Sequence, residues 1–246
     1  MKKIYATVFV ALLFDGCEKA QDYIKINPCA EMNLCTIKSI SYTGMFGEED
    51  SLVFTYNAVG NPVSITRRIA GSGMPNYAFK YDKKGRLTDF YAPYEARTAA
   101  EYWHKYFYDN KGRITIDSFY TLCDIKDDSL VSHHSGSRYV LQYDVQNRII
   151  LDSLEPPGIY YSTALHYTYD ANGNREGRTY DQKVHFRRTN KIWMFIDRDY
   201  SMNNAFTADA YNLYGLPTTF DLSTKGGGLN FLRNYLTSGK IVYTCR

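Results

Sequence analysis

A short phrase recurs six times along the 246-residue chain and constrains its fold more than any other feature. Each copy has a tyrosine, then Asp or Asn, two or three variable residues, a Gly or Asn, and usually an Arg, Leu or Ile. The copies begin at Tyr56, Tyr81, Tyr108, Tyr143, Tyr169 and Tyr211. Such a repeat indicates an architecture in which one supersecondary unit is used several times.

The polar residues of the phrase predict a tight turn. Asp or Asn at the start of a turn accepts hydrogen bonds from the backbone two residues on, and a later Gly adopts positive φ without steric cost. The fourth copy has Asn147 at the Gly position, and Asn also tolerates the left-handed region. We therefore expect positive φ at Gly85, Gly112 and Asn147. The predicted structural turn positions are Asn57, Gly60, Asp82, Gly85, Asp109, Gly112, Asp144, Asn147, Asp170, Gly173, Asn212 and Gly215.

Alternating apolar sequence flanks each turn, as at residues 77–81 and 87–91, and strand–turn–strand is typical of a β-hairpin. We expect a first strand at residues 37–42, a closing strand at 241–244, and an extra hairpin around 191–197. Only residues 94–104 have helical character, with one short turn at 99–102. The prediction is an all-β fold: an antiparallel β-meander of repeated hairpins forming a strongly curved open sheet or half-barrel, with at least ten strands and no helix beyond two turns. Whether the sheet closes is left open.

These copies resemble the YD repeat, the unit of the RHS proteins and of many small bacterial lipoproteins. The resemblance covers most of residues 50–220, although Asn57 and Asn212 replace Asp in copies one and six, and copy six lacks the Arg. In large family members, long arrays of such hairpins form a curling sheet that encloses a toxin, whereas this array is too short to enclose a passenger domain. The resemblance implies a fold and not a function.

The N-terminus has the pattern of a targeting segment. Lys2 and Lys3 precede an apolar stretch over residues 4–14, and Gly16-Cys17 resembles the end of a bacterial lipobox. We expect residues 1–16 to be a lipoprotein signal peptide, Cys17 to be lipidated, residues 17–36 to form a tether, and residues 37–246 to form a single β domain. This organisation places the protein at the outer membrane or cell surface of a Gram-negative bacterium. The alternative is an ordinary secretory signal, with Cys17 structural.

Four further cysteines remain after the signal: Cys29, Cys35, Cys123 and Cys245. They allow three pairings in an oxidising compartment, and the spacing of Cys29 and Cys35 is compatible with a local loop. Since zinc spacing is absent, we expect neither a metal nor a cofactor. His133 and His134 lie in a polar stretch with several aspartates, and we expect them to be solvated because no ligand spacing is met.

Charge argues against a nucleic-acid partner. The formal charge of +3 falls to about +1 once Lys2 and Lys3 are removed with the signal. Four basic residues gather near Trp193, and we expect them to form the charged outer face of a hairpin. They are Arg187, Arg188, Lys191 and Arg198.

The chain holds 24 tyrosines and 13 phenylalanines, and sheet packing accounts for most of them. Some rings exceed what the repeat requires and form the candidate binding surface on the concave face. They are Tyr91, Tyr94, Trp103, Tyr106, Tyr160, Tyr161 and Trp193.

Two hypotheses about function follow. The first is a non-catalytic, lipid-anchored envelope or surface scaffold that binds a glycan or protein partner. The second is a hydrolase acting on extracellular polysaccharide through an unrecognised carboxylate pair. The first requires only the repeat and the signal, whereas no catalytic motif in the sequence supports the second.

Overall fold

The computed structural model describes residues 31–32, 34–134, 136–158 and 163–246. The predicted signal peptide, Cys17, most of the predicted tether, Cys29, Tyr160 and Tyr161 lie outside the described residues. Within the described ranges, no helix is both long enough and apolar enough to cross a bilayer.

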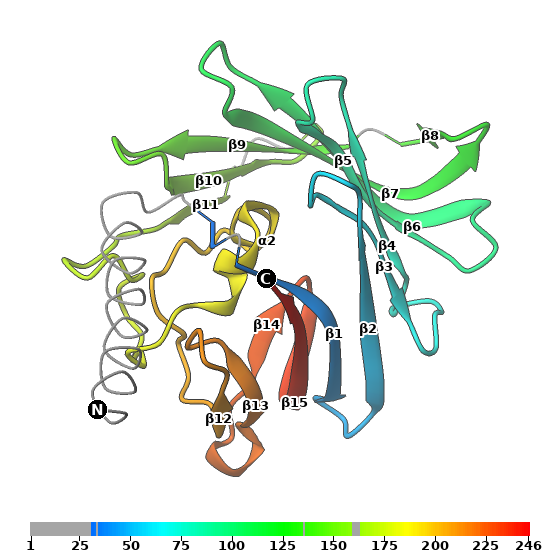
Figure 1. Ribbon diagram of the computed structural model, residues 1–246. Coiled ribbons are helices and arrows are strands. Elements are labelled where there is room, and N and C mark those ends of the chain that lie inside the picture. The colour runs from blue at the N-terminus through cyan, green and yellow to red at the C-terminus, as the bar shows by residue number, and fades with distance from the viewer. Residues whose placement is uncertain (1–30, 33, 135, 159–162) are drawn as a thin grey trace, which may run out of the picture.

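The described chain forms one 15-stranded antiparallel sheet that curls around its own concave side (Figure 1). The strands are β1 (Cys35–Gly44), β2 (Glu49–Tyr56), β3 (Pro62–Arg67), β4 (Tyr77–Tyr81), β5 (Leu87–Pro93), β6 (Ala99–Tyr108), β7 (Ile114–Lys126), β8 (Ser129–Ser132), β9 (Ser137–Tyr143), β10 (Ile149–Glu155), β11 (Thr163–His166), β12 (Ala210–Tyr211), β13 (Pro217–Asp221), β14 (Leu229–Phe231) and β15 (Asn234–Cys245). The helices are η1 (Phe186–Thr189), α2 (Lys191–Ile196) and η2 (Ser223–Lys225).

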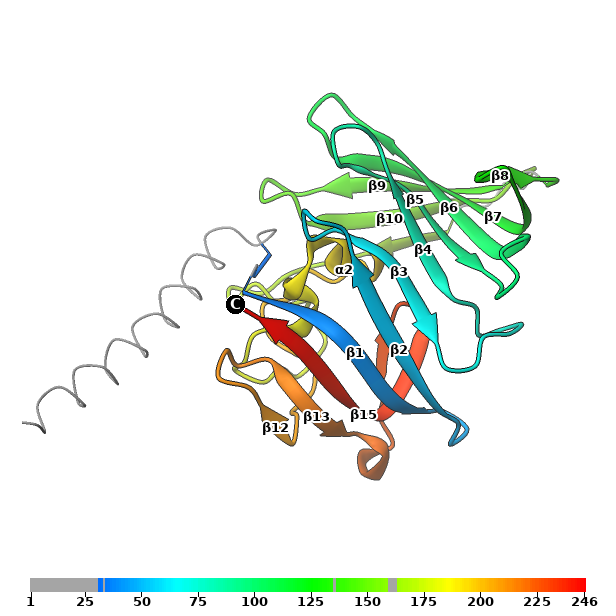
Figure 2. The ribbon, with the colours of Figure 1, turned by 45° about the vertical axis from the view of Figure 1, so that its right-hand side comes forward.

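Along the sheet the order is β11-β10-β9-β7-β6-β5-β4-β3-β2-β1-β15-β13-β12, with β14 beside β15 and β8 beside β7. The sheet is open, because β11 and β12 are its two ends and do not pair with each other. Figure 2 shows the sheet turned, with β1, β2 and β15 in front of the inner helices. The predicted fold class is confirmed, with more than ten strands and no described helix longer than six residues.

Each repeat turn is closed by its first polar residue, as predicted. Asp82 Oδ1 accepts hydrogen bonds from the backbone N–H groups of Lys84 and Arg86, both at 2.9 Å. Gly85 and Gly112 have φ values of +73° and +77°, and Asn147 has +61°. The predicted hydrogen bonds and positive φ values of the turns are therefore confirmed.

In the first five copies, the tyrosine of the phrase joins its own hairpin to the strand before it, whereas Tyr211 of the sixth copy donates to Asp181 Oδ2. Tyr81 Oη donates to Pro62 O at 2.6 Å, and Tyr108 Oη donates to Leu87 O at 2.7 Å. Tyr143 Oη donates in the same way to a β7 carbonyl oxygen at 2.6 Å. The tyrosines thus form a ladder of hydroxyl–carbonyl bonds along one rim of the sheet.

The arginine of the phrase points to the following hairpin. Arg86 Nε donates to Asp82 Oδ2 at 2.7 Å, and its guanidinium lies 4.5 Å from the ring centroid of Tyr108. Arg148 repeats this arrangement, with Asp144 Oδ2 at 2.7 Å and the ring of Tyr169 at 4.1 Å. In copies two to four, tyrosine and arginine therefore link the unit to both of its neighbours, a role that turn chemistry alone does not reveal.

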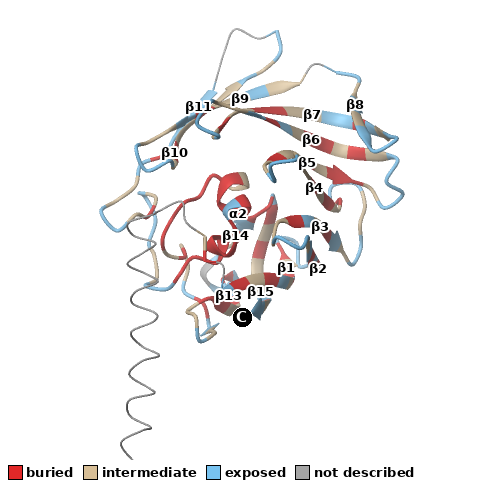
Figure 3. Cartoon of the chain, turned by 45° about the horizontal axis from the view of Figure 1, so that its top comes forward, coloured by how far each residue is buried: buried red, intermediate tan, exposed pale blue. Residues whose placement is uncertain are grey.

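The concave side of the sheet is filled by residues 184–208, which we call the inner segment. Most of its residues are buried, as Figure 3 shows. Trp193 is fully buried and meets Phe54 edge-on at 5.6 Å and Phe79 at 5.8 Å between ring centroids. Burial of this apolar surface is the dominant stabilising term for the domain.

Two sequence predictions in this part of the chain were wrong. Residues 191–197, expected to form a hairpin, contain helix α2, whose first turn is capped by Asn190 Oδ1 accepting from the N–H of Ile192. A short apolar run is ambiguous between a strand and a buried helix, and here the cap favours the helix. Residues 99–102, expected to form a helical turn, begin strand β6, which pairs with β5 and β7.

The two ends of the described chain meet in a disulfide between Cys35 and Cys245, which decides a pairing that the sequence left open and excludes a local loop closed by Cys29 and Cys35. The bond joins paired residues of β1 and β15 across 210 residues of sequence. β1 begins inside the predicted tether, and β15 begins before the predicted closing strand. Cys123 is buried and has no disulfide partner among the described residues.

Candidate binding site

The five described residues of the predicted binding surface do not form a surface of exposed rings. Trp193 and Tyr106 lie in the main core, where Tyr106 meets Phe195 edge-on at 5.1 Å between ring centroids. The prediction of an open concave face failed because the inner segment occupies it. These two rings are therefore unavailable to a ligand.

Trp103 is also buried, on the opposite face of β6 from Tyr106. It stacks on Tyr120 at 4.8 Å between ring centroids, and its Nε1 donates to Asp89 Oδ1 at 2.8 Å. The hairpin of β7 and β8 packs over this cluster with Ile125 and Leu130. Tyr91, packed against the same cluster, and Tyr94 are half-buried.

The basic cluster predicted to face solvent is mostly inside the molecule. Arg187, Arg188 and Arg198 are buried, whereas Lys191 is exposed. The prediction failed because these arginines belong to the inner segment and not to an outer hairpin face. His133, by contrast, is exposed and bonds Asp124 Oδ2 through Nε2 at 2.8 Å. Among the residues that the structure describes, no group of three potential metal ligands is present.

Arg198 ties the inner segment to two strands of the sheet. Its Nη2 donates to Asp117 Oδ2 at 2.6 Å on β7, and its Nε donates to Asp152 Oδ2 at 3.1 Å on β10. His104 Nδ1 lies 2.8 Å from the other oxygen of Asp117. Burial by itself raises the pKa of Asp117, but the positive charges of His104 and Arg198 outweigh it and lower that pKa.

A second buried polar cluster lies beside α2 and lines a cavity of about 330 Å³. Arg187 Nε donates to Asp197 Oδ2 at 2.6 Å, and Arg178 Nη1 donates to Asp199 Oδ2 at 3.3 Å. Burial lowers the pKa of His185, and the positive charges of Arg187, Arg188 and Arg178 lower it as well. The negative charge of Asp199 acts in the opposite direction but does not outweigh them, so the pKa of His185 is about 3. His185 is therefore neutral at pH 7.

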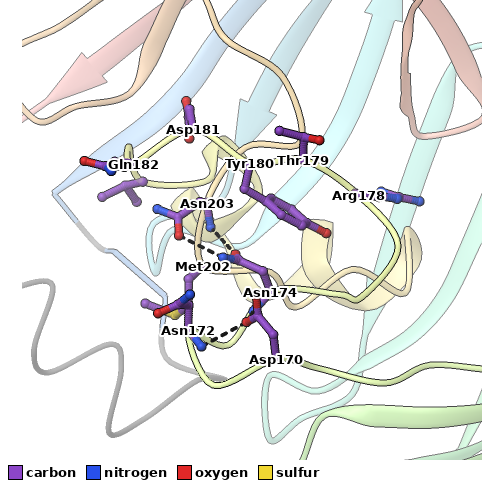
Figure 4. A pocket seen from close by; sticks show the side chains of 11 residues that line it. Asp170, Asn172, Asn174, Arg178, Thr179, Tyr180, Asp181, Gln182, Met202 and Asn203 are labelled. Atoms are coloured by element: carbon purple, nitrogen blue, oxygen red, sulfur yellow. Dashed lines mark hydrogen bonds between the residues drawn. The ribbon is translucent and has the colours of Figure 1, made fainter.

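A larger polar cleft of about 660 Å³ opens between the turn of residues 170–174 and the segment of residues 178–184 (Figure 4). Two mostly buried apolar side chains, Val184 and Met202, contribute to its lining. Its other lining residues are Asp170, Asn172, Asn174, Arg178, Thr179, Tyr180, Asp181, Gln182 and Asn203. The size is that of a small-molecule site, but the lining is far more polar than is usual.

Several hydrogen bonds hold the walls of this cleft in place. Asn174 Nδ2 donates to Asn203 Oδ1 at 3.0 Å, and Asn203 N donates back to Asn174 Oδ1 at 2.9 Å (Figure 4). Asp181 Oδ2 accepts from Tyr211 Oη at 2.8 Å and from Asn204 Nδ2 at 3.0 Å. Because these groups are fixed by the fold, the cleft is largely preformed.

Asp170 differs from the other aspartates of the cleft and of the repeat, because only one of its two carboxylate oxygens is bonded to the described residues. Its Oδ1 closes the turn by accepting from the N–H groups of Asn172 at 2.9 Å and Asn174 at 2.8 Å. The position that holds an arginine in copies two to four is Asn174 here, so Asp170 Oδ2 has no ion pair or hydrogen bond with the described residues. Arg175, one residue later, instead lies over the ring of Tyr167, 4.2 Å from its centroid.

No protein-family model matches the sequence, and no curated protein matches it. Among solved structures, the chain is similar to TcdB2-TccC3 without its hypervariable C-terminal region, at 12% identity and TM-score 0.26, over 75% of this chain and 11% of that chain. It is also similar to TcdB2-TccC3-Cdc42, at 11% identity and TM-score 0.25, over 57% of this chain and 10% of that chain. These weak neighbours are RHS-type YD-repeat chains, and this chain spans about a tenth of their length.

Proposed function

We propose that this protein is a non-catalytic scaffold of the YD-repeat type that binds a glycan or protein partner at the bacterial outer membrane or cell surface, where lipid on Cys17 anchors it. The small formal charge of about +1 that remains without Lys2 and Lys3 fits a partner other than nucleic acid. The N-terminal pattern of residues 1–17 supports the proposed anchoring.

The state of the buried carboxylates carries the non-catalytic part of the proposal. A hydrolase of the two-carboxylate type needs one group as a proton donor and a second as base or nucleophile. On the concave side, Asp117 and Asp152 share the guanidinium of Arg198, and the pKa of Asp117 is lowered. The lowered pKa of Asp117 favours a structural role over acid catalysis. Burial raises the pKa of Asp197, but both of its oxygens are engaged in the fold, by Arg187 Nε at 2.6 Å and by the N–H of Leu232 at 3.0 Å.

The disulfide between Cys35 and Cys245 supports an exported location. Disulfides form and persist in oxidising compartments such as the periplasm and the cell surface, and they are rare in the cytosol. This support is independent of the signal pattern, because it rests on a bond within the folded domain and not on residues 1–17.

Mass spectrometry of the mature N-terminus in cells that express the full chain tests the anchoring. We expect an acylated Cys17 at the N-terminus and recovery in the membrane fraction. Cys17→Ser is expected to lose the acyl chains and leave that fraction, because two chains supply most of the attachment energy. An unmodified N-terminus at another residue would overturn the anchoring, and cleavage of an extracellular polysaccharide by the purified protein would overturn the non-catalytic assignment.

A further inference from the structure

We propose that the polar cleft binds a neutral sugar unit of a glycan, and that Asp170 Oδ2 accepts hydrogen bonds from the sugar hydroxyls. This inference rests on the proposed scaffold function and names its site and ligand class. Three observations carry it: a departure from the repeat, the chemistry of the lining, and the charge balance of the cleft.

The fifth copy of the repeat breaks a rule that its neighbours keep. In copies two to four, an arginine four residues after the aspartate binds the outer carboxylate oxygen, as Arg148 binds Asp144 at 2.7 Å. Copy five keeps Asp170 but replaces that arginine with Asn174. Copies one and six differ again, because they begin with Asn57 and Asn212. Asn174 exchanges two hydrogen bonds with Asn203 instead, and Asp170 Oδ2 is left without a partner among the described residues. A local rule broken in this way is typical of a functional position.

The lining offers the groups that a polyhydroxyl ligand needs. A side-chain amide carries both donors and an acceptor, and a carboxylate carries only acceptors. The side-chain amides of Asn172 and Gln182 form no hydrogen bond with the described residues, so they are available together with Asp170 Oδ2. Met202 and Val184 provide apolar surface for the C–H face of a ring.

The cleft suits a neutral ligand better than an anion or a peptide. Its one arginine, Arg178, is already paired with Asp199 at 3.3 Å. Asp170 and Asp181 bring negative charge, because neither has an ion pair with the described residues and Asp181 accepts only from neutral donors such as Asn204 and Tyr211. A peptide would need a free strand edge or apolar pockets, and the walls here are a turn and an irregular segment. A neutral sugar needs neither a free cation nor a strand edge, because each of its hydroxyls can both donate and accept a hydrogen bond.

Asp170→Asn isolates the proposed contact. The remaining amide oxygen can still close the turn, because the chain uses Asn in this role: Asn57 Oδ1 accepts from Val59 N at 3.1 Å and from Asn61 N at 3.0 Å. The substitution replaces the free carboxylate oxygen by a donor. Asp144→Asn is the matched control, because it makes the same change in a copy whose carboxylate pairs with Arg148 and does not line the cleft.

The experiment uses the full chain carrying Cys17→Ser on an array of neutral and acidic glycans, followed by calorimetric titration with the neutral oligosaccharide that gives the strongest signal. We expect Asp170→Asn to raise Kd at least about tenfold, since a hydrogen bond to a charged group is lost. Asp144→Asn is expected to leave Kd unchanged. Gln182→Ala, at an exposed position of the opposite wall, is expected to raise Kd about threefold or more and guards against a folding defect in Asp170→Asn.

The other outcomes separate the site from the scaffold function. Glycan binding that Asp170→Asn and Gln182→Ala leave unchanged would place the ligand elsewhere and overturn this inference while keeping the scaffold. Preference for acidic glycans, or no binding to any glycan of the array, would overturn the assigned ligand class. Chromatographic detection of shortened oligosaccharide after incubation would instead overturn the non-catalytic function itself.

Discussion

The repeat array and the inner segment are stabilised in opposite ways. In the array, each copy closes its own turn, and its rim side chains join neighbouring hairpins, as Arg86 does with Asp82 and Tyr108. In the inner segment, the decisive contacts join residues far apart in sequence, such as Arg198 with Asp117, 81 residues away. The array therefore sets the shape of the sheet, and the inner segment completes its core.

The two regions also differ in where their charges lie. The side chain of Arg86 at the rim is 40% exposed, whereas that of Arg198 is 10% exposed. Ion pairs in water contribute little, because solvent screens them and side-chain entropy opposes them. Removing one partner of a buried pair leaves an uncompensated charge away from water. Substitutions in the two regions should accordingly differ strongly in cost.

Arg198→Met is expected to have the largest effect. It leaves Asp117 and Asp152 without their shared cation and should lower the free energy of unfolding by about 3–5 kcal/mol. Arg86→Met makes the same change at the rim and should cost about 1 kcal/mol or less. Urea denaturation followed by tryptophan fluorescence, which reports on the buried Trp193, measures both. Equal losses would show that the inner segment is no more dependent on buried charge than the array.

As the pH falls, the contribution of the inner segment to the free energy of unfolding should decrease at a higher pH than that of the array. His185 is 1% exposed, and burial lowers its pKa to about 3, below its ordinary value of 6.5. The unfolded chain therefore takes up the proton first, so stability is complete above about pH 6.5 and declines as the pH falls toward 3. At pH 5 the loss should be about 1–2 kcal/mol.

His185→Gln should remove this part of the pH dependence, measured as the difference between unfolding free energies at pH 7 and pH 5. His166→Gln, at an exposed position of β11, is the control and should leave the difference unchanged. Asp117 and Asp199, whose pKa values are lowered, weaken the fold only at more acidic pH and are present in every variant. An unaltered difference in His185→Gln would contradict a buried, neutral histidine.

Sequence reasoning succeeded where the determinants are local. Asp82 and Gly85 lie within one turn, so their hydrogen bonds and positive φ follow from residue type and order. The links from Tyr108 and Arg86 to neighbouring hairpins were missed, although the recurrence of tyrosine and arginine in the phrase was a usable signal. A residue that recurs beyond what the turn requires has a partner in the next unit.

The inner segment was beyond such reasoning, because nothing near Arg198 in sequence indicates that its partners are Asp117 and Asp152. When those partners are unknown, a cluster of arginines in the sequence indicates a solvent-exposed surface. The cleft could be predicted in part from the sequence. The replacement of arginine by Asn174 is visible in the sequence, but its consequence for Asp170 depends on the fold of residues 178–184.

The smallest predicted effect compares two tyrosines on one strand, β6. Tyr108 Oη donates to Leu87 O at 2.7 Å in the rim ladder, whereas the buried hydroxyl of Tyr102 makes no hydrogen bond of normal geometry with the described residues. Tyr108→Phe should cost about 1 kcal/mol, because it removes a bond between two hairpins. Tyr102→Phe should leave the free energy of unfolding unchanged or raise it, because it removes an unsatisfied buried group and keeps the ring under the guanidinium of Arg233. Thermal and urea denaturation of the two variants measure this difference, and a larger loss for Tyr102→Phe would mean that the ladder hydroxyls do not hold the array together.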